Sequence, residues 1–227
     1  MSTIHGPKDD NVVVATFSGG MDSTTLLYYL VDKGFYVHAL SVNYGQRHKK
    51  ELSFAKTVAK RLKIPHKVID LSSITTLLGG SALTDDIKVP HGHYADETMK
   101  ATVVPNRNAI LLNLAAAWSI SLGGNKIATG VHAGDHPIYP DCRPDFVNSL
   151  EAMLQFATDE PYFEVIAPFV HLSKTKIAVA GEKLKVPWNL TWSCYEGQEL
   201  HCGKCGTCVE RRESFYEAEV ADPTLYE

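Results

Sequence analysis

The sequence feature that most constrains the fold is a glycine-rich turn at residues 18–23, Ser-Gly-Gly-Met-Asp-Ser. It directly follows residues 11–17, a run rich in β-branched side chains, as is usual for a strand buried on both faces of a parallel sheet. After the turn, apolar residues recur at helical spacing between positions 26 and 31. A strand, a glycine turn and a helix in this order predict an α/β fold with an anion-binding loop.

The alternation of apolar patterns continues along the rest of the chain. Strands are expected at residues 35–42, 66–71, 126–131 and 164–169, and helices at 46–62, 106–122, 143–157 and 173–184, the last capped by Ser173. This order predicts a doubly wound, Rossmann-like α/β domain with a parallel sheet of about five strands. Residues 79–100 are irregular, which is typical of an active-site lid.

Composition narrows the class of protein further. The 227 residues suit one large domain with a small appendage, and we expect a nucleotide-binding domain at 1–186 and a small segment at 187–227. The net charge of −4 disfavours a nucleic-acid substrate. No apolar stretch reaches the roughly 18 residues of a membrane span, and the N-terminus lacks a secretory pattern, so a cytoplasmic location is expected.

The turn at residues 18–23 has the properties of a phosphate site. Its glycines allow close backbone approach, its consecutive N–H groups can surround an oxyanion, and the following helix adds its dipole. It is neither a Walker A loop, which needs a lysine, nor a G-x-G-x-x-G fingerprint. The alternative is a tight strand-to-helix turn with an aspartate cap. The segment resembles the S-G-G-x-D-S signature of the PP-loop ATP pyrophosphatases, which cleave ATP between its α- and β-phosphates.

That resemblance implies roles for individual residues of the loop. Asp22 would lie on the magnesium side and act in catalysis with Ser23. The resemblance further implies an ATP-binding segment made of Phe17, Ser18, Gly19, Gly20, Met21, Asp22, Ser23, Thr24, Thr25, Leu26 and Leu27.

Four of the five cysteines lie within residues 194–208. Cys194, Cys202, Cys205 and Cys208 have the spacing C-x7-C-x2-C-x2-C, which suits a closed tetrahedral zinc site of four thiolates. An iron–sulfur cluster is the alternative, although a fourth cysteine followed by proline is missing from this run. Because a four-thiolate site leaves no open position, we expect it to be structural, and chelation should unfold the C-terminal segment.

Five motifs together indicate which PP-loop enzymes the chain resembles. They lie at residues 17–27, 43–48, 104–108, 139–143 and 193–208, and in this order they resemble the 7-cyano-7-deazaguanine synthase (QueC) family of the queuosine pathway, from about residue 12 to 215. One departure is Val104-Pro-Asn-Arg-Asn, where many members have glycine in the third position. Asparagine tolerates a left-handed backbone, so the turn is expected to be kept.

The resemblance implies a carbon–nitrogen ligase that uses ATP, Mg²⁺ and Zn²⁺. It would convert 7-carboxy-7-deazaguanine and ammonia to the nitrile through an adenylated carboxylate and an amide. The expected partners are this small molecule and ammonia, with no nucleic acid and no membrane, and a homodimer is implied.

Polar residues at the ends of strands and starts of helices complete the candidate site. Arg47 is a candidate for substrate or phosphate contact, and Arg107 for a catalytic carboxylate or phosphate clamp. Asp141 is a candidate for recognising the N–H edge of the base, or else a cap for the helix from Arg143 onward. Arg143 is itself a substrate-binding candidate. Lys174 is the fourth catalytic candidate, for phosphate. Each of these arginines, and Lys174 as well, could also be a solvated surface residue.

Two other functions stay open from the residues alone. A tRNA-thiolating PP-loop enzyme would use the same loop, but it would contact nucleic acid, which the acidic composition disfavours. A nucleotide-binding regulatory domain would use the cysteine segment as a partner surface and would release no pyrophosphate.

Overall fold

A parallel sheet flanked by helices forms the centre of the protein, as seen in a computed structural model that describes residues 9–46, 49–93, 97–158, 160–196 and 199–227. Within these ranges the sheet has five strands in the order β3-β2-β1-β4-β5, and every neighbouring pair is parallel. The strands are β1 Val12–Thr16, β2 Tyr36–Asn43, β3 His66–Asp70, β4 Lys126–Ala128 and β5 Glu164–Ile166. The predicted doubly wound α/β fold is therefore confirmed.

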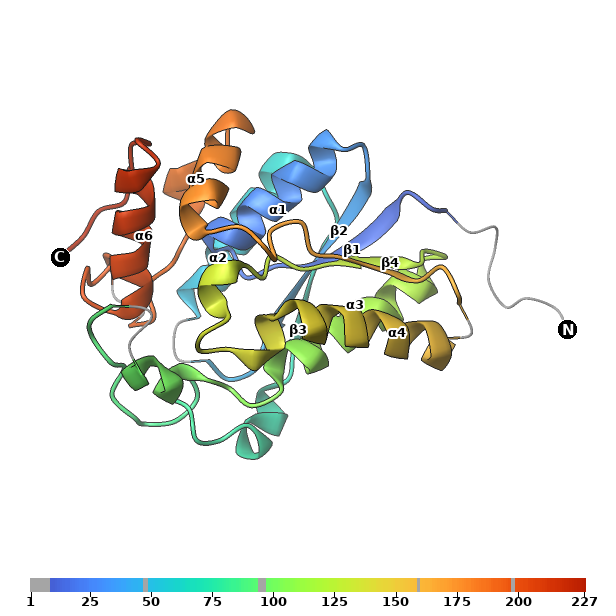
Figure 1. Ribbon diagram of the computed structural model, residues 1–227, viewed down its shortest axis with the longest axis horizontal. Helices are drawn as coiled ribbons and strands as arrows, with labels where there is room; N and C mark the ends of the chain where they lie inside the picture. The colour runs from blue at the N-terminus through green and yellow to red at the C-terminus, as the bar shows by residue number, and fades with distance from the viewer. Residues whose placement is uncertain (1–8, 47–48, 94–96, 159, 197–198) are drawn as a thin grey trace, which may run out of the picture.

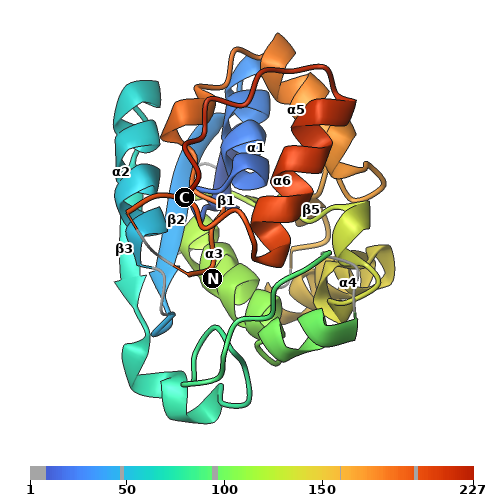
Figure 2. The same cartoon turned by 90° about the vertical axis from the view of Figure 1, so that its left-hand side faces the viewer.

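Helices cover both faces of the sheet (Figure 1). The helices are α1 Met21–Asp32, α2 Lys50–Leu62, α3 Arg107–Ser121, α4 Pro144–Thr158, α5 Lys174–Lys183 and α6 Gly206–Glu217. In Figure 1, α1 and α5 lie above the sheet and α3 and α4 below it. The last helix, α6, packs beside α5 at one end of the molecule (Figures 1 and 2).

The apolar run in β1 explains why this strand lies at the centre of the sheet. Val13 and Ala15 are fully buried in a core with residues of α1, α2 and α5, whereas Val14 is fully buried in the opposite core with α3 and α4. Successive side chains of a strand point to opposite faces, so a strand covered on both sides needs no polar positions.

The structure shortens two predicted strands. The strands predicted at 126–131 and 164–169 end at Ala128 and Ile166. The chain leaves the sheet after β4, and Thr129, Gly130 and Val131 line a cavity. A buried segment can resemble a strand in sequence without pairing in a sheet, and periodicity alone does not distinguish the two cases.

Helix α6 was not predicted from the sequence. It begins at the cysteine cluster, with Cys205 as N-cap, and buries Arg211, Ser214 and Phe215 on one side. Only a few apolar residues mark this face, and one of its buried side chains is an arginine. A helical stripe was therefore hard to recognise, and the helix is held by tertiary packing.

The irregular segment at 79–100 packs against the C-terminal segment. Ala82 and Val89 share a buried cluster with Trp192 and the four cysteines. His91 forms an antiparallel bridge with Cys205, and Gly92 N donates to the Lys204 carbonyl at 3.1 Å. A role as a lid stays a prediction, as does the domain division at residue 186.

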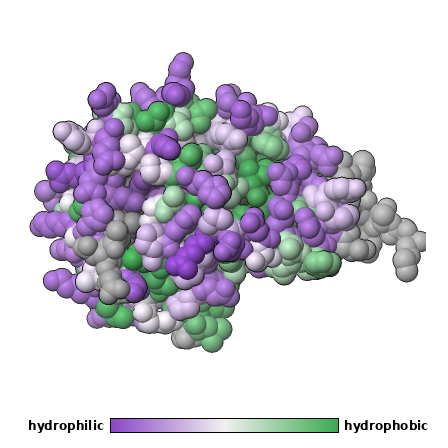
Figure 3. All heavy atoms as spheres, viewed as in Figure 1, coloured by the Kyte–Doolittle hydropathy of each residue, from purple (hydrophilic) through white to green (hydrophobic). Residues whose placement is uncertain are grey.

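Hydrophilic residues cover much of the face shown in Figure 3, with hydrophobic residues visible between them. Such mixing is ordinary for a folded surface. In the part of the chain that the structure describes, no helix is both long enough and apolar enough to span a membrane.

Candidate active site

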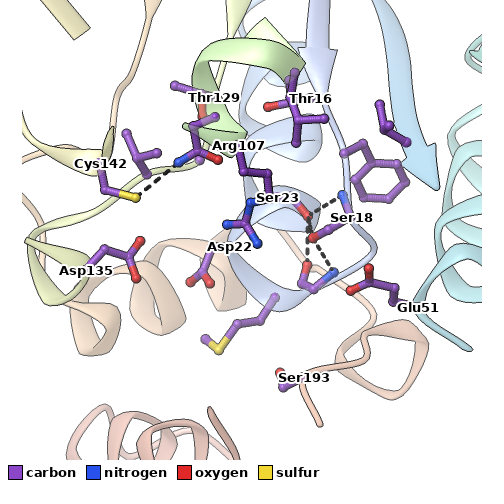
Figure 4. Close-up of a pocket in the computed structure, with 18 of the residues that line it drawn as sticks. Thr16, Ser18, Asp22, Ser23, Glu51, Arg107, Thr129, Asp135, Cys142 and Ser193 are labelled. Carbon is purple, nitrogen blue, oxygen red and sulfur yellow. Dashed lines mark hydrogen bonds between the residues drawn. The ribbon is translucent and has the colours of Figure 1, made fainter. Parts of the chain in front are cut away.

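A cavity of about 230 Å³ lies at the carboxyl ends of β1 and β4 (Figure 4). These two strands are neighbours, but the chain continues from β1 into α1 and from β4 toward α4, on opposite faces of the sheet. Such a topological switch point opens a crevice in which doubly wound proteins bind ligands. The Ser18–Ser23 turn forms one wall of this cavity.

The turn has the backbone geometry of an anion site. Gly19 has φ +88°, and a Cβ atom there would lie 2.5 Å from the Glu51 carbonyl oxygen, so the turn and α2 are in close contact. Gly20 is the N-cap of α1 and supplies no side-chain hydrogen bond. The first N–H groups of α1 are therefore left for another partner, and a phosphate oxygen suits them.

Two serine hydroxyls brace the turn. Ser18 Oγ lies 3.1 Å from Ser23 Oγ, and Ser18 N donates to Ser23 Oγ at 3.3 Å. On the other side, a Cβ at Gly130 would lie 3.3 Å from the backbone of Asp22 and of Ser23, so the loop after β4 touches the turn. A side chain at position 130 would push these two walls apart.

The residues of the predicted ATP-binding segment divide into two groups. Phe17, Ser18, Gly20, Met21, Asp22 and Ser23 line the cavity. Thr24, Thr25, Leu26 and Leu27 are fully buried, and Gly19 faces α2. Thr25 Oγ1 donates to the Met21 carbonyl at 2.8 Å, inside α1. The second group therefore supports the helix from behind and does not face the cavity.

Lys174 lies at the phosphate side of the cavity, at the start of α5. Its Nζ is 3.4 Å from Asp22 Oδ2 and donates to Glu210 Oε2 at 2.6 Å. Burial alone would lower the pKa of Lys174, but the carboxylates of Asp22 and Glu210 outweigh burial and raise it. Lys174 is thus a buried, permanently charged ammonium, and the surface alternative considered from the sequence is excluded.

His132 joins this charged cluster from the end of β4. Its Nδ1 accepts a hydrogen bond from Gly134 N at 3.1 Å, so Nδ1 carries no proton. The proton then resides on Nε2, which lies 3.5 Å from Asp135 Oδ2 and 3.8 Å from Asp22 Oδ2. His132 is 1% exposed, and its Nε2 faces both carboxylates.

One oxygen of Asp22 has a different environment. Oδ1 is buried and has no hydrogen-bond partner among the described residues, while Oδ2 faces Lys174 and His132. A buried carboxylate oxygen without a donor is costly, unless a bound cation satisfies it. An oxygen donor of this kind fits a hard cation such as magnesium.

Arg107 opens α3 and points into the cavity (Figure 4). Its Nη1 donates to the Tyr44 hydroxyl at 3.3 Å, and its guanidinium carbon lies 5.7 Å from the Tyr44 ring centroid. The preceding Asn106 has φ +57°, so the left-handed turn expected from the sequence is present. Burial raises the pKa of both Tyr44 and Tyr195, which therefore line the cavity as neutral phenols.

Asp141 caps a helix, but not the one considered from the sequence. Its Oδ2 accepts from Asn108 N at 3.0 Å at the start of α3, and its carbonyl accepts from Asn108 Nδ2 at 3.0 Å. The Asp141 carboxylate is not among the groups that line the cavity, whereas Asp135 and Cys142 are. Recognition of the base by Asp141 stays a prediction.

Cys142 is buried against Asn108, whose Nδ2 lies 3.3 Å from its Sγ. Burial raises the pKa of this thiol, and the carboxylates of Asp135 and Asp141 raise it further. A protonated thiol is a poor nucleophile, so we assign Cys142 to the cavity wall and not to catalysis.

Two predicted residues remain, Arg143 and Arg47. Arg143 is exposed, and its Nε donates to the His136 carbonyl at 2.9 Å, away from the cavity lining. Arg47 lies outside the described residues, as does its neighbour His48. Their substrate roles stay predictions.

Several residues of the site were not found from the sequence. His132 and Glu210 belong to the charged cluster, and Tyr44 and Tyr195 to the Arg107 side. His132 had a usable signal, because it follows β4 at the edge where ligands bind. Glu210 had none, because it lies in a helix that was not predicted.

The four cysteines form a second centre beside the cavity. All four are buried, and their Sγ atoms lie within 4.8 Å of one another. Cys202 Sγ and Cys208 Sγ are 4.0 Å apart, near the roughly 3.8 Å expected for tetrahedral zinc with Zn–S bonds of about 2.3 Å. Backbone N–H groups of Lys204 and Cys205 point to Cys202 Sγ at 3.4 and 3.3 Å. The donor set fits a thiolate-bound metal.

The sheet order, the switch-point cavity and the uncapped glycine-rich turn define an ATP-utilising α/β protein of the PP-loop type. The family described as "Queuosine biosynthesis protein QueC" matches residues 12–219. The chain therefore belongs to the QueC family.

Curated relatives agree with this assignment. A protein named 7-cyano-7-deazaguanine synthase from Pseudoalteromonas atlantica is 52% identical over 95% of this chain and 98% of its own length. Proteins of the same name from Brucella anthropi and Hahella chejuensis are 54% and 53% identical over 92% and 96% of this chain, and 91% and 94% of their own lengths.

Solved structures share the fold at low identity. The NMN synthetase of Francisella tularensis has a TM-score of 0.51 at 16% identity, over 93% of this chain and 78% of its own. A 4-thiouridine synthetase–RNA complex with bound ATP has a TM-score of 0.51 at 15% identity, over 78% of this chain and 41% of its own. These likenesses show the fold alone.

Proposed function

We propose that this protein is an ATP-dependent 7-cyano-7-deazaguanine synthase, which converts 7-carboxy-7-deazaguanine and ammonia to the nitrile. The relatives that match almost the whole chain bear this name. The observation that supports the mechanism is that the phosphate turn and Arg107 line one and the same cavity. A carboxylate bound by Arg107 would face the ATP phosphates.

The phosphate end would hold ATP for cleavage between its α- and β-phosphates. The uncapped N-terminus of α1 offers N–H donors, and Lys174 offers a fixed positive charge. Asp22 would hold a magnesium ion through its unpartnered Oδ1, and the ion would supply charge neutralisation at the phosphates. These groups would already be in place when negative charge moves to pyrophosphate. Electrostatic catalysis is most effective when the stabilising groups need no reorganisation.

Arg107 would orient the acid. The Arg107 guanidinium suits bidentate binding of a carboxylate, and Tyr44 holds it from one side. The carboxylate of Asp135 lines the same cavity, 3.5 Å from His132 Nε2, and would accept hydrogen bonds from the N–H edge of a deazaguanine. We propose Asp135 as a further candidate for base recognition, in addition to Asp141.

The reaction itself places few demands on acid–base groups. Attack of the carboxylate on the α-phosphorus releases pyrophosphate and makes the carbonyl carbon an acyl electrophile. Ammonia then displaces AMP and loses a proton to give the amide. The amide oxygen attacks the α-phosphorus of a second ATP, releasing pyrophosphate, and it leaves as AMP while the nitrogen loses its two protons and the nitrile forms. Positioning and charge stabilisation carry most of this chemistry.

The cysteine cluster would hold zinc in a structural role. Four thiolates at near-tetrahedral separation complete its coordination, so no position is open for substrate. We also propose that the protein is a homodimer and that it binds no nucleic acid. Light scattering would test the first proposal, and the ultraviolet absorbance ratio of the purified protein would test the second.

The deciding experiment measures pyrophosphate and product mass. Purified protein is incubated with ATP, magnesium and ammonium, with and without 7-carboxy-7-deazaguanine. Acid-dependent release of pyrophosphate and AMP together with the nitrile is expected. Pyrophosphate release that does not depend on this acid, or no nitrile, would refute the proposed substrate.

A further inference from the structure

Glu210 connects the cysteine cluster to the active site. It lies in the first turns of α6, two residues after Cys208, and Cys205 is the N-cap of this helix. Its Oε2 accepts from Lys174 Nζ at 2.6 Å, and the two side chains are 14% and 9% exposed. The start of α6 is thus fixed by the cysteines, and the helix presents a carboxylate toward α5.

The contact continues from Lys174 to the phosphate turn. Lys174 Nζ lies 3.4 Å from Asp22 Oδ2, farther than its 2.6 Å distance from Glu210. The ammonium is therefore bound more closely on the α6 side. In Figure 1, α5 lies between α6 and α1, and it is in contact with both helices.

This difference in distance has a consequence for catalysis. If the charge on Glu210 were absent, the Lys174 ammonium would be attracted most strongly by Asp22. It would then pair with the carboxylate that is proposed to serve magnesium and would withdraw from its place beside the phosphates. Buried, hydrogen-bonded charge pairs of this kind are strong enough to fix a side chain.

We propose that Glu210 is a positioning residue, which holds Lys174 at the distance from Asp22 that ATP binding requires. The inference rests on the proposed function for its kinetic part only. It predicts that Glu210 affects the ATP end of the cavity and leaves the acid end unchanged.

The test compares Glu210→Gln with Glu217→Gln. Glu217 lies on the same helix and accepts from Thr175 Oγ1 at 2.7 Å, but this contact is exposed and outside the cavity. Loss of a charge-assisted buried hydrogen bond is expected to raise KM for ATP about tenfold to a hundredfold in E210Q. KM for the acid and the metal content should stay at the wild-type values, and E217Q should match the wild type throughout.

A double-variant cycle separates positioning from a general loss of structure. In a Lys174→Gln background, E210Q should change KM for ATP no further, because Glu210 acts through Lys174. Additive effects would overturn the inference, and so would equal rises in KM for ATP and for the acid. Should E210Q lose metal or melt early, Glu210→Asp, which keeps the charge, should restore most of the ATP affinity. An E210D protein as weak as E210Q would count against the inference.

ATP affinity measured by calorimetry without the acid makes the two proposals distinguishable. If the wild type makes no nitrile but E210Q binds ATP more weakly, the proposed function fails and the positioning role stands. If the wild type makes nitrile and E210Q binds ATP normally, the positioning role fails.

Discussion

Lys174 Nζ lies 3.4 Å from Asp22 Oδ2, whereas the other oxygen of Asp22, Oδ1, is buried with no hydrogen-bond partner in the described ranges. One carboxylate therefore has a paired side and an open side. The ammonium fixes the first, and the second is suited to a cation that arrives with ATP.

We expect Asp22→Asn to reduce kcat/KM for ATP by about a hundredfold to a thousandfold, the cost of removing one preorganised charge contact. The magnesium concentration for half-maximal rate should rise, because an amide oxygen is a weaker ligand than a carboxylate. Initial pyrophosphate release across a magnesium titration measures both. A D22N protein with the wild-type magnesium dependence would contradict this role for Asp22.

Arg107→Lys tests the carboxylate end of the cavity. A lysine keeps the charge but not the planar fork, so KM for the acid should rise about tenfold to a hundredfold. KM for ATP should change little, because the proposed role of Arg107 is to bind the acid. Steady-state kinetics with each substrate varied in turn provide the measurement. A rise confined to ATP would place Arg107 on the phosphates.

The cysteine cluster predicts one zinc ion per chain. Cys205→Ser should lower the zinc content measured by mass spectrometry and lower the Tm, since metal binding and folding of this segment are linked. The matched control is Cys142→Ser, because Cys142 is equally buried but lies in the cavity wall. It should keep the full zinc content. Iron in place of zinc, with visible absorbance, would support the iron–sulfur alternative.

Gly19→Ala should destabilise the protein more than Gly34→Ala does. Both glycines have positive φ, +88° and +82°, so alanine carries a similar backbone strain of about 1–2 kcal/mol at each. Only at Gly19 would the new Cβ meet a neighbour, the Glu51 carbonyl oxygen at 2.5 Å, whereas nothing lies within 4 Å at Gly34. Urea unfolding of the two variants measures the difference. Equal losses would show that the turn adjusts freely.

His66 contributes to the pH dependence of stability. Its Nε2 lies 2.8 Å from Ser41 Oγ, which in turn donates to the Phe17 carbonyl. Burial lowers the pKa of His66 below 6.5, and the charge of Lys56 lowers it further. A depressed folded-state pKa gives stability that is present above the unfolded pKa and is lost as pH falls through the folded pKa.

The free energy of unfolding should therefore decrease between about pH 7.5 and about pH 5.5, a range that spans the ordinary histidine pKa. In His66→Gln this decrease should be smaller. His38 and His201 also have pKa values lowered by burial, so they contribute to the slope that remains. Urea titrations at several pH values give the comparison, and an unchanged slope in H66Q would rule out a contribution from His66.

The sequence and the structure agree best where the pattern is local. The largely apolar run at residues 11–17 predicts a strand that is buried on both faces, and β1 lies there. Asn106 permits a left-handed turn, and its φ is +57°. Ser173 was expected to cap a helix, and its hydroxyl accepts from Lys176 N.

Agreement is weaker where a residue's role depends on distant partners. Asp141 follows a strand and precedes a helix, so the sequence offered a ligand contact or a cap for that next helix. The structure shows that it caps α3 through Asn108, which lies 33 residues earlier. Helix α6 was missed for a related reason, because its buried face includes the charged Arg211, which pairs with Asp222 at 3.0 Å.

The doubly wound fold, the phosphate turn and the four-thiolate cluster were all predictable from the residue order. Each of these depends on residue types at short, fixed spacing, because backbone geometry acts over a few residues. Only the tertiary structure brought Asp22, His132, Lys174 and Glu210 together, from α1, the end of β4, α5 and α6. Their distances depend on how the helices pack across the switch point, and packing is a property of the whole chain that no local spacing encodes.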